Sequence, residues 1–272
     1  MLFGKEENIA GHAPARIWAV AEEHINAYQH DDIDRLMGTV SPGGGIWAGL
    51  LPSQGPVILR SVGQIRQAYS HALAAVRIGP CQSYIALASD WYVLVQGRTT
   101  VTEKATGRSA AMTGLGFYGT DGAGLAMDTD VGSILAVDQG PVSGQQKLAD
   151  FDAHRRRLEA FAAGDADGAL AGVSDRLDLF LPCFDPEEAA LQVHVSDRAA
   201  YRAYLEQFAR RYHVDAVTQV NRLAADGWVF SETEWSLSDK QAGDRFAVRV
   251  AHCDVLAADR AVRGGIGVAI RG

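Results

Sequence analysis

The first candidate for a side chain that moves a proton near neutral pH is His24, in the stretch EEHINAYQ. Apolar residues surround it at the spacing of one buried helix face: Val20, Ala21 and Tyr28. Burial shifts the pKa of an ionisable side chain, which suits such a group to general acid–base catalysis. The structural alternative is a histidine at the edge of the core that hydrogen-bonds a carbonyl group.

Two carboxylates form a second candidate site, in the stretch LAMDTDVGS. Asp128 and Asp130 are separated by one residue, so both side chains lie on one face of the expected strand. A carboxylate in apolar surroundings could act as a base or as the partner of an imidazole. The alternative is a pair of strand acids that face the solvent.

A third candidate pair, His252 and Asp254, lies in the stretch RVAHCDVLA and also shares one face of an expected strand. The acid could orient the imidazole there. The sequence therefore offers catalytic candidates in both halves of the chain.

The two halves of the chain repeat one pattern of residues. Three blocks recur in the same order, at offsets of 133, 135 and 136 residues. The paired blocks begin at Ile25 and Leu158, at Ser61 and Ser196, and at Ala86 and Arg222. Such a period is too long for a solenoid and predicts two domains of one fold. We place them at residues 1–140 and 147–272, joined by the Gly/Pro/Gln-rich stretch DQGPVSGQQ.

Each half has the same expected order of elements. An amphipathic helix comes first, and the turn HDDID or GDADG follows, whose acid is expected to cap a short second helix. A third helix starts after Ser61 or Ser196. The rest is an antiparallel meander of three strands, with ATGR or QAGD as a hairpin turn. Helices followed by a meander predict an α+β fold.

This order, with its GDADG-like turn and its hairpin, resembles the NTF2-like superfamily, and within it the SnoaL-like and ketosteroid-isomerase-like proteins. The resemblance covers the chain twice. It implies two cones, each a curved sheet around helices with an apolar pocket at the wide end. Members commonly pair through the outer sheet face, so the two copies are expected to form a pseudo-dimer within one chain. The superfamily contains lyases and isomerases of hydrophobic small molecules, and also non-catalytic binding and assembly domains.

The resemblance also implies roles for residues. His24 matches the position of an oxyanion-binding tyrosine in ketosteroid isomerases, and Asp128 or Asp130 matches an aspartate of SnoaL-like cyclases. Ala48 falls where ketosteroid isomerases have their base, so a steroid-isomerase mechanism is not expected. The residues expected to shape the pocket and bind the substrate are aromatic: Tyr28, Trp47, Phe117 and Tyr118. Tyr69 recurs as Tyr204 and is interpreted as structural.

Two functions follow as hypotheses. The first is a cofactor-independent lyase or isomerase that acts on an apolar or aromatic, ring-containing small molecule, with no metal. The alternative is a non-catalytic protein that binds a small ligand or serves assembly. The net charge of −8 and pI of about 5.5 argue against nucleic acid or an anionic membrane as the partner. No signal-peptide or membrane-spanning stretch is found, and the three cysteines look reduced, so we expect a cytoplasmic protein. A homo-oligomer of the tandem chain is a further expectation.

Overall fold

The computed structural model describes residues 12–51, 55–130, 141–184 and 192–271. The chain divides into two compact units, Met1–Ala136 and Val137–Gly272. The division falls within residues 131–140, which lie outside the described part. Helix α5 begins at Gly144, three residues before the start predicted for the second domain. Within the described residues, no helix is both long and apolar enough to cross a membrane.

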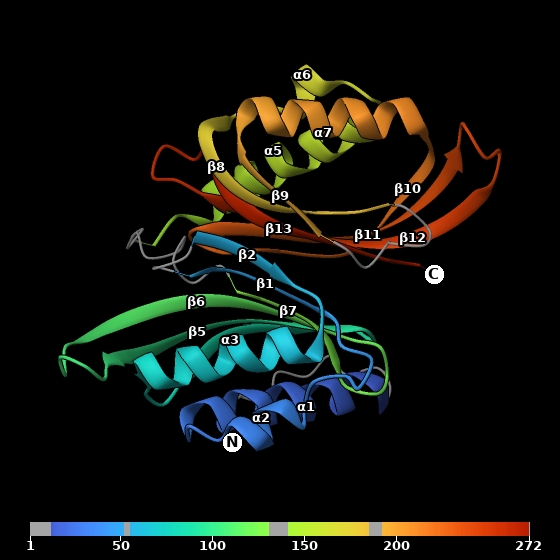
Figure 1. The fold of residues 1–272 in the computed structure, drawn as a ribbon. Helices are drawn as coiled ribbons and strands as arrows, with labels where there is room; N and C mark the ends of the chain where they lie inside the picture. Colours follow the sequence, from blue (N-terminus) through green and yellow to red (C-terminus); the bar gives the residue numbers. More distant parts are fainter. Residues whose placement is uncertain (1–11, 52–54, 131–140, 185–191, 272) are drawn as a thin grey trace. The chain divides into compact units, whose positions relative to one another are not determined.

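The first unit packs three helices against one face of a curled, seven-stranded sheet (Figure 1). The helices are α1 (His12–Gln29), α2 (Ile33–Met37) and α3 (Val62–Ala75). The strands are β1 (Ile46–Leu51), β2 (Gly55–Leu59), β3 (Val76–Ile78), β4 (Gln82–Ala88), β5 (Tyr92–Glu103), β6 (Ser109–Thr120) and β7 (Leu125–Asp130). The sheet order is β2-β1-β7-β6-β5-β3, with β4 also paired to β5. The pairing of β1 with β7 is parallel and the other pairings are antiparallel.

The second unit repeats this arrangement around a six-stranded sheet of order β10-β11-β12-β13-β8-β9. Its helices are α5 (Gly144–Ala162), α6 (Ala166–Ala169) and α7 (Arg198–Arg211). Its strands are β8 (Val173–Pro182), β9 (Gln192–Asp197), β10 (Tyr212–Ala224), β11 (Trp228–Asp239), β12 (Arg245–Leu256) and β13 (Val262–Arg271). The predicted α+β fold with two tandem copies is confirmed. Strand β10 was not among the predicted strands, and neither were β3 and β4, the two shorter strands that correspond to it in the first unit.

Residues that recur between the copies make the same local contacts. The side chains of Asp32 and Asp165 accept hydrogen bonds from backbone N–H groups three residues on, so each caps its short helix as predicted. Lys104 and Lys240 each donate from Nζ to a carbonyl in the last turn of the third helix, at Leu73 and Ala209. That contact satisfies a carbonyl that the helix itself leaves unpaired.

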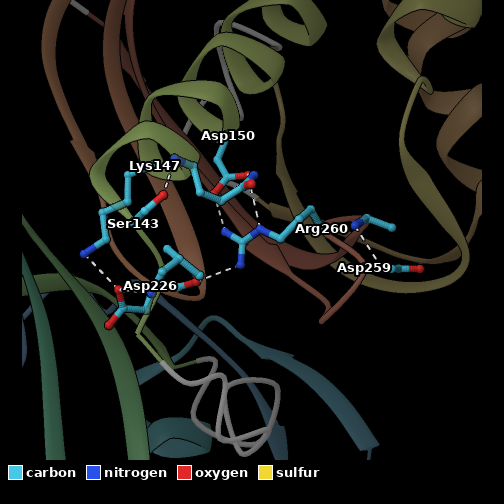
Figure 2. Close-up of polar contacts among 9 residues, drawn as sticks. Ser143, Lys147, Asp150, Asp226, Asp259 and Arg260 are labelled. Carbon is cyan, nitrogen blue, oxygen red and sulfur yellow. Dashed lines mark hydrogen bonds and ion pairs between the residues drawn. The ribbon is translucent and has the colours of Figure 1, made fainter.

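A polar cluster holds the start of α5 against the sheet of the second unit (Figure 2). Arg260 binds the buried carboxylate of Asp150 through two of its nitrogens, and a third donates to the Asp226 carbonyl at 2.9 Å. The Asp226 carboxylate pairs with Lys147 at 2.8 Å. Arg260 has a backbone φ of 66°, which an L side chain rarely adopts. These contacts tie the helix to two sheet turns at once.

The Asp150–Arg260 pair generates a prediction about stability. Asp150→Asn removes the charge from a buried ion pair and leaves the guanidinium without its counterion. We expect it to lower the free energy of unfolding of the second unit by about 3 kcal/mol. The measurement is denaturant unfolding, monitored through the hydrogen exchange of the α5 amides. Asp152→Asn, an exposed acid two residues further along the same helix, is the matched control and should change little. Equal effects of the two substitutions would contradict the prediction.

Candidate active site

The first unit contains a cavity of about 190 Å³ between its helices and its sheet. Most of the residues around it are apolar or aromatic, and the polar ones gather near α1, α3 and β7. The lining residues are His24, Ile25, Tyr28, Trp47, Tyr69, Ile78, Cys81, Val95, Gly97, Thr99, Met112, Gly114, Gly116, Tyr118 and Asp128. A mainly apolar cavity with a few convergent polar groups is the usual form of a small-molecule site.

Three inward positions of β5 and β6 that line the cavity are glycines and add no side chain to it. Gly97 pairs with Gly114 across the two strands, and Gly116 pairs with Val95. An added Cβ atom at Gly116 would lie 2.8 Å from the Tyr118 hydroxyl, so the glycine makes room for that ring. In the second unit, residues in the same strand register carry side chains: Thr233, Val250 and His252.

The corresponding space in the second unit is filled by aromatic rings. Trp235 occupies the register position that Thr99 holds in the first unit. Its ring lies 5.3 Å from Phe161 and 5.7 Å from Phe184, centroid to centroid, and Phe208 lies 4.7 Å from Phe161. All four rings are buried. The second copy therefore uses as hydrophobic core the space that the first copy leaves open.

Three side chains from three elements meet at the polar end of the cavity. His24 comes from α1, Tyr69 from α3 and Asp128 from β7. The His24 Nε2 atom lies 3.1 Å from the Tyr69 hydroxyl and 3.4 Å from Asp128 Oδ2. The Tyr69 hydroxyl donates a short hydrogen bond to Asp128 Oδ2. His24 and Tyr69 are each only 3% exposed, and the side chain of Asp128 is 13% exposed.

Aromatic rings stand around this cluster. The Tyr118 ring lies 5.8 Å from the His24 ring, and Tyr28 and Trp47 lie 5.9 and 6.0 Å from the Tyr69 ring. Trp47 follows three glycines, of which Gly44 has a φ of 81° and Gly45 has no room for a Cβ atom beside Ala126. These rings give the polar end flat apolar walls against which a ring-shaped ligand can lie.

The electrostatics of the cluster keep Tyr69 protonated. Burial raises the pKa of Tyr69 well above its usual range, and the Asp128 carboxylate and their hydrogen bond raise it further. Tyr69 therefore stays a hydrogen-bond donor, whereas the imidazole and the carboxylate can exchange protons. The arrangement can take a proton from one atom of a ligand and stabilise or protonate another.

The structure places most of the predicted pocket residues at this cavity: His24, Tyr28, Trp47, Tyr118 and Asp128. Phe117 is a correction, because strand alternation puts it on the opposite face of β6, where its ring stacks on Tyr92 at 5.1 Å. Asp130 belongs to β7, but its side chain lies outside the described part of the chain. Tyr69 was set aside as structural and in fact contacts both His24 and Asp128. The hydroxyl of Tyr204, its counterpart in the second unit, instead donates to the Pro182 carbonyl. The only difference visible in the sequence was in their expected neighbours, since Arg157 stands in the place of His24.

In the second unit, His252 and Asp254 are in contact, with Nε2 and Oδ1 3.3 Å apart. They belong to a larger buried network that the sequence did not reveal. The other Asp254 oxygen accepts from Arg157 and lies 2.5 Å from His154 Nδ1. The other ring nitrogen of His154 lies 2.8 Å from the Ser231 hydroxyl.

The pKa shifts in this network favour an ionised acid beside a neutral imidazole. Burial alone would raise the pKa of Asp254, but the Arg157 guanidinium and His154 outweigh it and hold that pKa well below its usual range. Burial lowers the pKa of His154, although Asp254 acts in the opposite direction. Ser231, His154 and Asp254 stand in the order of a nucleophilic triad. However, Ser231 is 0% exposed, so its hydroxyl cannot meet a ligand here.

Among the described residues, no group of three or more His, Cys, Asp or Glu side chains is placed to hold a metal ion.

The buried His154 generates a prediction about pH. Its pKa is lower in the folded state than the 6.5 of an unfolded histidine, so below about pH 6.5 the unfolded state binds more protons. The free energy of unfolding of the second unit should therefore decrease as the pH is lowered below about 6.5, by up to about 1.4 kcal/mol per pH unit. His154→Gln should remove this part of the slope, measured by hydrogen exchange of the β11 and β12 amides. His213→Gln, at an exposed histidine, should keep it; a slope unchanged by His154→Gln would refute the assignment.

No protein-family model matches the chain, and no curated protein matches it. Solved structures match one copy at a time. A ketosteroid isomerase-like protein from Erwinia carotovora is 17% identical, with 45% of this chain and 97% of that chain covered and a TM-score of 0.36. An LEH-like epoxide hydrolase from Mycobacterium tuberculosis is 14% identical (46% and 85% covered, TM-score 0.37). An NTF2-like protein of unknown function from Burkholderia pseudomallei is 14% identical (44% and 90% covered, TM-score 0.38).

Proposed function

We propose that the first unit is a cofactor-independent lyase or isomerase that acts on a small, ring-containing apolar molecule by general acid–base catalysis. The observation that carries this proposal is the His24–Tyr69–Asp128 cluster at the end of an apolar cavity. Buried ionisable groups that converge on a cavity are typical of proton-transfer sites. We assign no catalytic role to the second unit, whose interior is filled by side chains.

The size of the cavity limits the substrate. Its volume of about 190 Å³ is smaller than the roughly 300–1,000 Å³ of pockets for drug-sized ligands. A single ring with short substituents fits this space better than a fused polycycle. Tyr28, Trp47 and Tyr118 supply the walls along which the ring lies.

The roles of the three polar groups follow from their protonation. Asp128 is the base that removes a proton from a carbon atom of the substrate, and its slight exposure toward the cavity gives it access. Tyr69 and His24 stabilise the oxygen on which negative charge develops, and His24 delivers a proton to it. In an isomerisation that proton stays on the product. In an elimination the oxygen leaves as a hydroxyl group that takes the proton and departs as water.

The first test of this function is solvent proton exchange. The full-length protein is incubated in D₂O with single-ring ketones, epoxides and β-hydroxy compounds, and deuterium incorporation and product mass are followed. We expect exchange or conversion with one class, and Asp128→Asn to slow it by about 10²- to 10⁴-fold. Asp34→Asn, at an exposed acid of α2 paired with Arg66, is the control and should keep the rate. If compounds bind but the protein catalyses neither deuterium exchange nor conversion of any of them, the proposed catalytic function is contradicted and the non-catalytic alternative is favoured.

A second test fills the cavity. Gly114→Val gives the first unit the side chain that Val250 supplies at the same register position in the second. Since Gly114 does not have a positive φ, the backbone tolerates the change. We expect the ring-containing ligand to lose binding by at least about tenfold, measured by ligand-observed NMR, with the circular dichroism of the fold retained. Unchanged affinity would show that the ligand binds elsewhere.

A further inference from the structure

The geometry points to Thr39 as a positioning residue that fixes the tautomer of His24, so that the proton this imidazole exchanges is always on Nε2. Its catalytic meaning rests on the proposed function, but the tautomer does not. Thr39 follows helix α2, and its Oγ1 atom lies 2.6 Å from His24 Nδ1. Thr39 is 6% exposed and His24 is 3% exposed, so water does not compete for this bond.

Counting protons on the threonine hydroxyl determines the direction of that bond. Oγ1 also lies 2.7 Å from the carbonyl oxygen of Leu36, which can only accept a hydrogen bond. A hydroxyl group has one proton, and here it is donated to Leu36. Oγ1 must therefore accept from His24, and Nδ1 carries a proton whether the imidazole is neutral or charged.

The exchangeable proton of His24 is then confined to Nε2, the nitrogen that faces the catalytic groups. The titratable groups packed around the ring are Tyr69 from α3, Tyr118 from β6 and Asp128 from β7. In the opposite tautomer Nε2 would be protonated in the neutral imidazole and could not accept a proton. With Nδ1 protonated, Nε2 can alternate between acceptor and donor within reach of a ligand.

A second count shows how many protons the cluster holds. The contacts of Tyr69 with His24 and with Asp128 are two hydrogen bonds, and Tyr69 supplies one proton. Because the Tyr69 hydroxyl donates to Asp128 Oδ2, the proton in its contact with His24 comes from Nε2. That Nε2 proton is the one available to a substrate oxygen.

The second unit supports the assignment independently. The residue in the place of Thr39 is Gly172, at the offset of 133 residues that also puts Arg157 in the place of His24. The backbone contact is kept, because the carbonyls of Thr39 and Gly172 each accept at 2.8 Å, from Leu125 and Val262. The second copy, which lacks the histidine, thus keeps this backbone hydrogen bond but lacks the threonine hydroxyl.

The test reads the tautomer directly in the full-length protein without a ligand. The eight histidines are labelled with ¹⁵N, and the signals of His24 are assigned by their loss in His24→Gln. Above the titration of the ring, we expect the Nδ1 chemical shift in the protonated range and the Nε2 shift in the unprotonated range. A neutral His24 with Nε2 protonated overturns the inference without the need for any other variant.

Variants separate this role from packing. Thr39→Val keeps the shape and removes the hydroxyl, so we expect the proton to move to Nε2 in the neutral ring, whereas Thr39→Ser should restore the wild-type shifts. Thr120→Val is the matched control: its hydroxyl likewise donates to a carbonyl, of Gly124, and accepts an N–H, from Gly122. It should leave His24 unchanged. A Thr39→Val protein with wild-type shifts, or a Thr120→Val protein with an equal change, overturns the inference.

The outcomes also distinguish this inference from the proposed function. If Nδ1 is protonated but no ligand is converted, the role of Thr39 stands and the proposed catalytic function is contradicted. If a ligand is converted by a protein whose neutral His24 is protonated on Nε2, the catalytic function stands and the role of Thr39 is contradicted.

Discussion

The space between the helices and the concave face of each sheet is the constraint on which the rest of this structure depends. A curled sheet that wraps around helices leaves an interior that side chains must fill or that stays hollow. In the second unit Trp235 and the phenylalanines around it fill this interior. In the first unit Gly97, Gly114 and Gly116 leave it open. Whether a few inward strand positions carry glycine or a larger side chain therefore decides which copy can bind a ligand.

Both copies place polar groups at the inner end of this space, and the two sets behave differently. In the second unit the Asp254 carboxylate is matched by Arg157, so its charge is compensated and the network is locked. In the first unit Asp128 has a tyrosine and an imidazole as partners, and neither is a permanent cation. A buried acid whose partners can themselves give or take a proton is suited to proton transfer, whereas a buried acid held by arginine is suited to stability.

The sequence predicted the elements better than it predicted the contacts. The helix caps at Asp32 and Asp165 and the order of helices followed by a meander depend on local signals, and the structure confirms them, although strands β3, β4 and β10 were not predicted. The contact of Tyr69 with Asp128 joins residues 59 positions apart, and no local pattern carries it. Comparison of the copies also misled where it was used alone, because Tyr69 and Tyr204 are identical in type and differ only in what their hydroxyls meet. Phe117 and Tyr118 are neighbours on β6, so strand alternation allows only one of them to face the cavity, and a run of small and aromatic residues does not determine which one.

The pattern of repetition itself separates two kinds of constraint. The residues that recur, such as Lys104 and Lys240, satisfy backbone groups that every copy of this fold leaves unpaired. The residues that differ, such as His24 and Arg157, point into the interior, where the backbone makes no demand on them. A fold whose backbone needs are met by turn and cap residues leaves its interior free to vary. For that reason the same arrangement of strands can hold a packed core in one copy and, in the other, a cavity with a proton-bearing cluster at its end.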